Sequence, residues 1–123
     1  MVALRILVID DEAYARQLVR VLLEKEGYEV TAATSADEGL RLIREARPDL
    51  VTLDLMMPGR DGLDMLAEKQ ADPSIQGIPC LVLSAVGLNA DLERALALGA
   101  RATLSKPFSQ RQLLDAVLEL VGR

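Results

Sequence analysis

Five side chains that can do chemistry follow apolar runs in this sequence of 123 residues. They are Asp10 and Asp11 after 4–9, Asp54 after 49–53, Ser84 after 80–83 and Lys106 after 102–105. A carboxylate at the end of a buried strand lies at the rim of a sheet, a usual place for reactive acids. A carboxylate can also act as a nucleophile and become an acyl phosphate. We therefore expect Asp54 to accept a phosphoryl group if the other side chains converge on it.

The expected cluster has a chemical logic of its own. Three carboxylates at one rim repel one another, so a cation or protonation must relieve that cost. Mg²⁺ typically takes one or two protein carboxylates together with water and phosphate oxygens. Two acids could hold such an ion while the third attacks phosphorus. Lys106 would neutralise charge on the phosphoryl oxygens, and the hydroxyl of Ser84 could donate to another of them.

The order of the elements predicts an α/β fold with a parallel sheet. Five apolar or alternating strand patterns, at 4–9, 28–33, 49–53, 80–83 and 102–105, alternate with five helical patterns joined by short loops. In such a sheet the carboxyl ends of the strands share one edge, where ligands bind. The sequences Ser35–Glu38 and Ser109–Gln112 have the spacing of capping boxes.

Two helical stripes are expected to face the core. The first contains Ala15, Leu18, Val19, Leu22 and Leu23, and the last contains Leu113, Leu114, Val117, Leu118 and Val121. Arg16 and Arg20 fall on the polar side of the first helix. The pattern shows no exposed apolar stripe, which favours a monomer.

Composition excludes several classes of function. A net charge of −5 and only three aromatic residues argue against a nucleic-acid interface. No apolar run approaches the roughly 20 residues that cross a bilayer. The absence of histidine removes histidine-based catalysis and metal ligation. A single cysteine, Cys80, suits a reducing cytoplasm and is expected to be a small buried hydrophobe.

Taken together, these motifs resemble the receiver domains of response regulators in two-component signalling. The resemblance covers residues 1–123 as one domain. It rests on Asp10-Asp11, on 54–62 (Asp-Leu-Met-Met-Pro-Gly-Arg-Asp-Gly), on 83–85 (Leu-Ser-Ala), on Gly99-Ala100 and on 106–108 (Lys-Pro-Phe). It implies a doubly wound, flavodoxin-like (βα)₅ fold with strand order 2-1-3-4-5.

The resemblance also implies a role for each site residue. Asp54 would be phosphorylated by a sensor histidine kinase or a histidine phosphotransfer protein. Asp10, Asp11, Asp54 and the backbone carbonyl of Met56 would bind Mg²⁺. Lys106 would pair with phosphoryl oxygens, and Ser84 would move towards them on activation. The bond between Lys106 and Pro107 would be cis.

The same resemblance implies a switch rather than a multiple-turnover enzyme, with self-phosphorylation from a donor and slow self-dephosphorylation. Output would pass to an effector protein through the helix after residue 89, the strand at 102–105 and the last helix, or through an effector domain outside this chain. The cognate kinase, the target and the pathway are not specified by the residues. Whether 123 residues are a full length or a fragment also stays open.

Thr103 departs from the family pattern, which has an aromatic residue three positions before the lysine. We expect switching to move 84–88 and the following helix without rotation of a ring. A receiver that binds partners constitutively is one alternative, encouraged by Thr103 alone. A phosphatase with an aspartyl intermediate is another, but it usually carries a second acid two residues after the nucleophile, where this chain has Met56.

Overall fold

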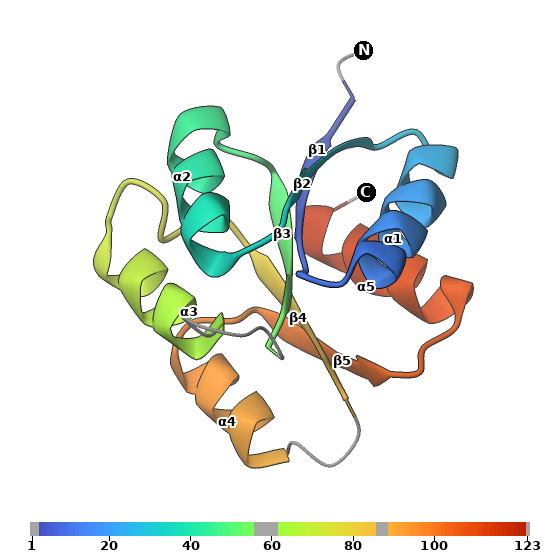
Figure 1. Cartoon of the computed structure of the whole chain (residues 1–123). Helices are drawn as coiled ribbons and strands as arrows, with labels where there is room; N and C mark the ends of the chain where they lie inside the picture. Colours follow the sequence, from blue (N-terminus) through green and yellow to red (C-terminus); the bar gives the residue numbers. More distant parts are fainter. Residues whose placement is uncertain (1–2, 56–61, 86–88, 123) are drawn as a thin grey trace.

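The five predicted strands and five predicted helices are all present in the computed structural model, which describes residues 3–55, 62–85 and 89–122 (Figure 1). The strands are β1 (Arg5–Ile9), β2 (Glu29–Ala33), β3 (Leu50–Asp54), β4 (Cys80–Ala85) and β5 (Ala102–Lys106). The helices are α1 (Ala13–Lys25), α2 (Ala36–Ala46), α3 (Gly62–Ala71), α4 (Asn89–Ala97) and α5 (Gln110–Val121). All neighbouring strands pair in parallel, in the order β2-β1-β3-β4-β5, which confirms the expected fold.

The sheet separates two hydrophobic cores. Helices α1 and α5 cover one face, and α2, α3 and α4 cover the other (Figure 1). Side chains alternate between these faces along each strand. In β3, Leu50 packs with α1 and α5 while Val51 and Leu53 pack on the opposite side. Every residue of β3 is buried, as expected for a central parallel strand.

Thr52 is the polar exception inside this central strand. It is 1% exposed and shares the face of Leu50 and Asp54. Its strand neighbours are Val8 and Leu81, which are apolar. Its hydroxyl Oγ1 has no hydrogen-bond partner among the described residues. Burying a hydroxyl without a partner costs free energy.

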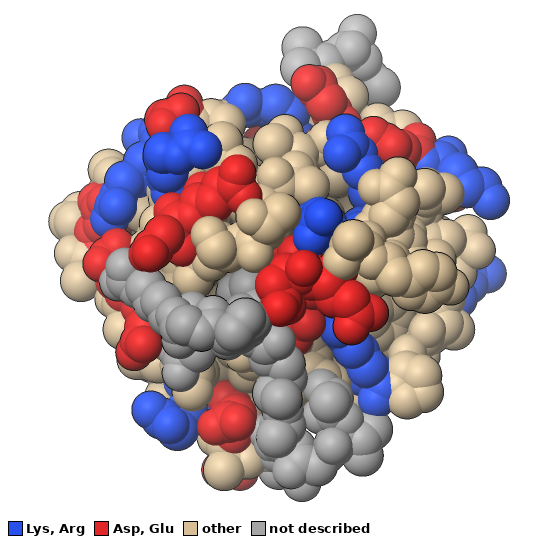
Figure 2. All heavy atoms as spheres, in the orientation of Figure 1, with Lys and Arg blue, Asp and Glu red and all other residues tan. Residues whose placement is uncertain are grey.

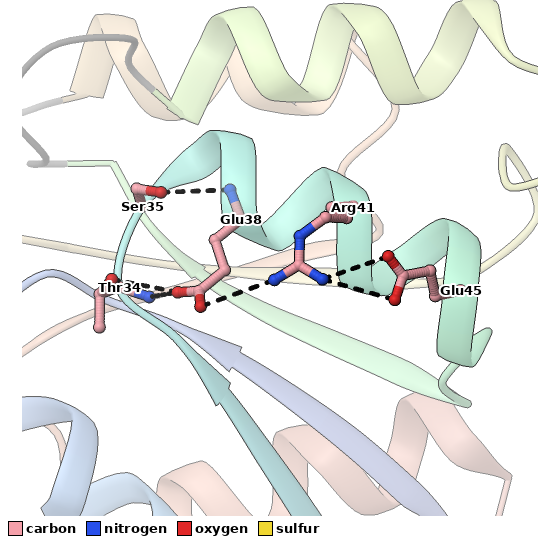
Figure 3. Close-up of polar contacts among 5 residues, drawn as sticks. All are labelled: Thr34, Ser35, Glu38, Arg41 and Glu45. Carbon is pink, nitrogen blue, oxygen red and sulfur yellow. Dashed lines mark hydrogen bonds and ion pairs between the residues drawn. The ribbon is translucent and has the colours of Figure 1, made fainter.

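The two predicted capping boxes have different outcomes. At α5 the box is complete, since Ser109 Oγ accepts from the Gln112 N–H at 3.0 Å and Gln112 Oε1 accepts from the Ser109 N–H at 2.8 Å. At α2, Ser35 accepts from the Glu38 N–H at 3.1 Å. The Glu38 carboxylate, however, reaches one residue further back, to the N–H and hydroxyl of Thr34 at 2.6 and 3.0 Å (Figure 3). The second half of that prediction was therefore wrong.

The expected orientation of two leucines was also wrong. Leu18 in α1 and Leu118 in α5 are 45% and 44% exposed. Leu18 belongs to an exposed stripe with Tyr14 and Val21, spaced by four and three residues along α1. The apolar arc of α1 is wider than its contact with the sheet, and periodicity cannot tell which part of a wide arc is covered. The expectation that no apolar stripe is exposed was therefore incorrect.

Two unusual groups lie inside the core, one in α3 and one at the start of β4. Lys69 is 2% exposed, and its Nζ donates to the backbone oxygen of Gln76 at 3.3 Å. Burial lowers the pKa of Lys69. Cys80 is fully buried as predicted, and burial raises the pKa of its thiol to about 12. None of the helices that the structure describes has the length and apolar character needed to cross a membrane.

Candidate functional site

The carboxyl ends of β1 and β3 bring three aspartates together. Asp54 is the last residue of β3, and Asp10 and Asp11 follow β1, which is its neighbour in the sheet. One carboxylate oxygen from each of the three lies within 4.8 Å of the others. Figure 2 shows acidic side chains gathered near the centre of the visible face, where β1 and β3 end in Figure 1. Asp10 and Asp54 are buried, whereas Asp11 is exposed.

Lys106 reaches this cluster from the edge strand β5. Its Nζ donates to Asp54 Oδ2 at 3.2 Å and lies 3.8 Å from Asp10 Oδ2. Strand β4 lies between β3 and β5, so the long lysine side chain spans the width of a strand to make this contact. The bond between Lys106 and Pro107 is cis, as the resemblance implied.

The pKa of Asp10 reflects the burial and the mutual repulsion of these carboxylates. Burial is the main cause that raises the pKa of Asp10, and the neighbouring carboxyl of Asp54 raises it further. The Glu12 N–H, which donates to Asp10 Oδ1 at 2.9 Å, and the charge of Lys106 act in the opposite direction. One ammonium thus only partly offsets the carboxylates, and the cluster favours additional positive charge.

The donor set suits a hard divalent cation. All three converging groups are carboxylates, and oxygen ligands of this kind are those that Mg²⁺ prefers. The convergence of three carboxylate oxygens, beside only one lysine, is the feature that fits such an ion. The predicted fourth ligand, the backbone carbonyl of Met56, lies outside the described residues.

Ser84 and Thr103 lie in β4 and β5, beyond the strands that carry the aspartates. Ser84 is fully buried near the end of β4, and strand alternation places it on the face of Val82, opposite to that of Asp54. Thr103 is half-buried in β5, where it pairs with Val82. The loop residues 86–88, which belong to the predicted moving segment, lie outside the described part of the chain.

Sequence reasoning missed one residue at this edge, Arg16. Its guanidinium donates to the backbone oxygen of Asp10 at 2.9 Å. Helical periodicity had assigned Arg16 to the solvent side of α1. The available signal was its place in the first turn of the helix, because helical side chains point back towards the N-terminus and here towards the strand end.

Comparison with known proteins identifies the family. The family model for the response regulator receiver domain matches residues 6–118. The chain belongs to this family. Receiver domains are the response-regulator modules of two-component signalling, so the fold and the family inferred from the motifs are both confirmed.

Similar curated proteins are transcriptional regulators. The chain is 37% identical to the phosphate regulon transcriptional regulatory protein PhoB of Pseudomonas aeruginosa, over 99% of this chain and 55% of that protein. It is 39% identical to the transcriptional regulatory protein ResD of Bacillus subtilis, over 97% of this chain and 48% of that protein. This receiver chain therefore spans about half the length of these relatives.

Solved receiver structures match over nearly the whole chain. A putative response regulator from Chloroflexus aurantiacus has a TM-score of 0.94 at 29% identity, covering 99% of this chain and 100% of that one. The chemotaxis protein CheY4 of Vibrio cholerae has a TM-score of 0.90 at 28% identity, covering 97% and 99%.

Proposed function

We propose that Asp54 is the phosphoacceptor of this receiver domain. The observation that carries the proposal is the meeting of Asp54 with Lys106 at 3.2 Å inside the cluster of three aspartates. Among the three acids, Asp54 is the one whose carboxylate is closest to the ammonium. A phosphoryl group on Asp54 would therefore lie beside a positive charge that can pair with its oxygens.

The transfer would proceed by attack of an Asp54 carboxylate oxygen on phosphorus. A phosphorus–oxygen bond forms, the bond to the donor histidine nitrogen of the partner kinase breaks, and that imidazole keeps the electron pair. Lys106 would orient the incoming group and offset its charge, and Ser84 would donate its hydroxyl to a phosphoryl oxygen once it moves. Mg²⁺, held by Asp10, Asp11 and Asp54 with the Met56 carbonyl, would stabilise charge on the phosphoryl oxygens.

We propose a stoichiometric switch rather than a multiple-turnover enzyme. The residue two places after Asp54 is Met56, so this chain lacks the second acid that phosphatases of the aspartyl type use at that position. Phosphorylation then changes the charge at the ends of β1 and β3 and shifts an equilibrium between two conformations. Slow hydrolysis of the aspartyl phosphate resets the switch.

The phosphodonor would dock beside the acid cluster. The exposed stripe of Tyr14, Leu18 and Val21 begins one turn from Asp10 and Asp11. A groove of about 370 Å³, lined by Asp10, Glu12, Tyr14, Ala15, Leu18, Val19, Lys106, Pro107 and Phe108, connects this stripe to the site. Apolar side chains at such spacing fit a helical partner, which is how a sensor histidine kinase or phosphotransfer protein would approach.

For output we propose the surface of α4, β5 and α5. Leu96 in α4 is 49% exposed, so this surface offers an apolar contact to an effector. Because Thr103 carries no ring, the switch would move 84–88 and α4 only. Comparing crystal structures with and without beryllofluoride tests this, and an unmoved segment would contradict it and favour a constitutive binding module.

Two further assignments complete the proposal. The receiver domain would extend over residues 1–123, slightly beyond the family match at 6–118. A cytoplasmic location suits a phosphorylated signalling domain whose one cysteine, Cys80, is an unpaired buried thiol.

The decisive experiment is labelling by a small phosphodonor such as acetyl phosphate with Mg²⁺, followed by intact-mass measurement. The wild type should gain one phosphoryl group and Asp54→Asn none. The control is Asp115→Asn, an exposed aspartate of α5 whose carboxylate lies 3.9 Å from Arg111. It should be labelled like the wild type. Labelling that persists in Asp54→Asn rules out Asp54 as the acceptor.

A further inference from the structure

Asp11 differs from the other two acids in how its position is fixed. Asp10 and Asp54 are buried and lie against Lys106, so packing and ion pairs hold them. The carboxylate of Asp11 is exposed and makes no hydrogen bond or ion pair with any residue that the structure describes. Its place within 4.8 Å of the other carboxylates therefore depends on the backbone that carries it.

That backbone is a tight turn held by side chains. The Asp10 N–H donates to the oxygen of Ala33 at 3.1 Å, which ties the turn to β2. Asp10 Oδ1 accepts from the Glu12 N–H at 2.9 Å. The peptide between Asp10 and Asp11 has its carbonyl oxygen fixed by Arg16 Nη1 at 2.9 Å. This is a charge-assisted hydrogen bond from a half-buried guanidinium, and such bonds are stronger than neutral ones.

Arg16 also lies near the turn that precedes α2. Hydrogen bonds from Thr34 are the main reason why the pKa of Glu38 is lowered, and the charges of Arg41 and Arg16 add to the effect. Glu38 thus lies near Arg16, but its carboxylate already binds Thr34 and approaches Arg41 at 3.9 Å (Figure 3). Among the described residues, the side chain of Arg16 forms its hydrogen bond with the Asp10 carbonyl, so its effect is directed at the turn that follows β1.

We propose that Arg16 is a positioning residue for the cation site. By fixing the peptide between Asp10 and Asp11, it directs the exposed Asp11 carboxylate towards Asp10 and Asp54. This inference rests on the proposed function, in which the three acids bind Mg²⁺. Partners that orient metal ligands typically change metal affinity by about 10- to 100-fold when they are removed. Arg16 should therefore act on Mg²⁺ affinity and not on the chemical step.

The test is sharp because a purely electrostatic effect of Arg16 and a positioning role predict opposite changes in Mg²⁺ affinity when Arg16 is replaced. Removing a positive charge near three carboxylates should by itself strengthen the binding of a divalent cation. A positioning role predicts that Arg16→Met weakens Mg²⁺ binding about tenfold or more, although it removes a cation. Arg20→Met is the matched control, since Arg20 lies one turn further along α1 and pairs with Glu24 at 3.4 Å on the surface.

The experiment measures Mg²⁺ binding to the unphosphorylated protein by isothermal titration calorimetry. Labelling by acetyl phosphate is then followed as a function of Mg²⁺ concentration. We expect Arg16→Met to need about tenfold more Mg²⁺ for half-maximal labelling, with the same maximal rate as the wild type. Arg16→Lys, which keeps a charged donor, should restore most of the affinity, and Arg20→Met should match the wild type.

Melting in EDTA shows whether each variant is folded. If Arg16→Met melts below the assay temperature, Arg16→Gln, whose shorter side chain cannot reach the Asp10 carbonyl, should show the same loss. Unchanged or tighter Mg²⁺ binding in the folded Arg16 variants, with the wild type still labelled on Asp54, overturns the role of Arg16 alone. Absence of Mg²⁺ binding by the wild type overturns the proposed cation site and this inference together.

Discussion

The buried hydroxyl of Thr52 provides a quantitative test of the structure. Replacing Thr52 by Val keeps the shape of the side chain and exchanges a hydroxyl for a methyl group. Thr52 is 1% exposed, its hydroxyl has no partner among the described residues, and its strand neighbours Val8 and Leu81 are apolar. A buried hydroxyl without a partner costs about 1–3 kcal/mol, so Thr52→Val should raise the free energy of unfolding by about 1–2 kcal/mol.

Urea unfolding followed by circular dichroism measures this difference, and the slope against urea should not change. In a domain of this size, 1 kcal/mol corresponds to roughly 3–6 °C in the melting temperature. Thr31→Val is the control, because Thr31 is exposed in the edge strand β2 and its substitution should change the stability by no more than about 0.5 kcal/mol. Equal or lower stability of Thr52→Val would mean that the hydroxyl does have a partner in the folded protein, and the reasoning would fail.

Two further predictions concern the buried groups Lys69 and Cys80. Burial lowers the pKa of Lys69 from its ordinary value of 10.5. Between the lowered pKa and 10.5 the unfolded chain therefore binds more protons than the folded one, and the wild type becomes more stable as the pH rises. Lys69→Met should therefore be more stable than the wild type at pH 7 by about 1 kcal/mol, and urea unfolding should show this gain shrinking at higher pH. If the extra stability of Lys69→Met instead grew with pH, the pKa of Lys69 could not be lowered by burial. Cys80, with its thiol pKa raised to about 12, should not react with a thiol reagent at pH 8 in the native protein but should react fully in urea. Rapid native labelling would show that β4 opens readily.

Much of the fold could be predicted because strand and helix patterns are local and because parallel topology places all strand ends at one edge. This is why the sequence alone predicts that Asp10, Asp11, Asp54 and Lys106 meet at one site, as they do in the structure. The order of the strands came from the resemblance to receiver domains, since nothing in the residues distinguishes one arrangement of β2 and β1 from another.

Most of the failures arise because the apolar periodicity of a helix does not show which part of its surface contacts the sheet. Leu18 and Leu118 fit the apolar arcs of their helices but lie beyond the region that the sheet covers. Arg16 fits the polar arc of α1, yet its long side chain turns back to the strand end. Glu38 has the spacing of a capping box, but its carboxylate accepts from the N–H of Thr34 and not from that of Ser35. The two N–H groups are adjacent in the chain, so spacing alone does not show which of them the carboxylate binds.

The contact between Lys106 and Asp54 has a mechanical consequence. Strand β5 forms the border of the sheet, and its last residue, Lys106, forms an ion pair with Asp54 at the end of the central strand β3. Any group added to Asp54 must displace the Lys106 ammonium or pair with it. Either change acts on β5, the edge strand, which partner proteins can contact. A change of charge at Asp54 can in this way reach the edge strand β5 through a single lysine side chain, in addition to the proposed movement of 84–88 and α4.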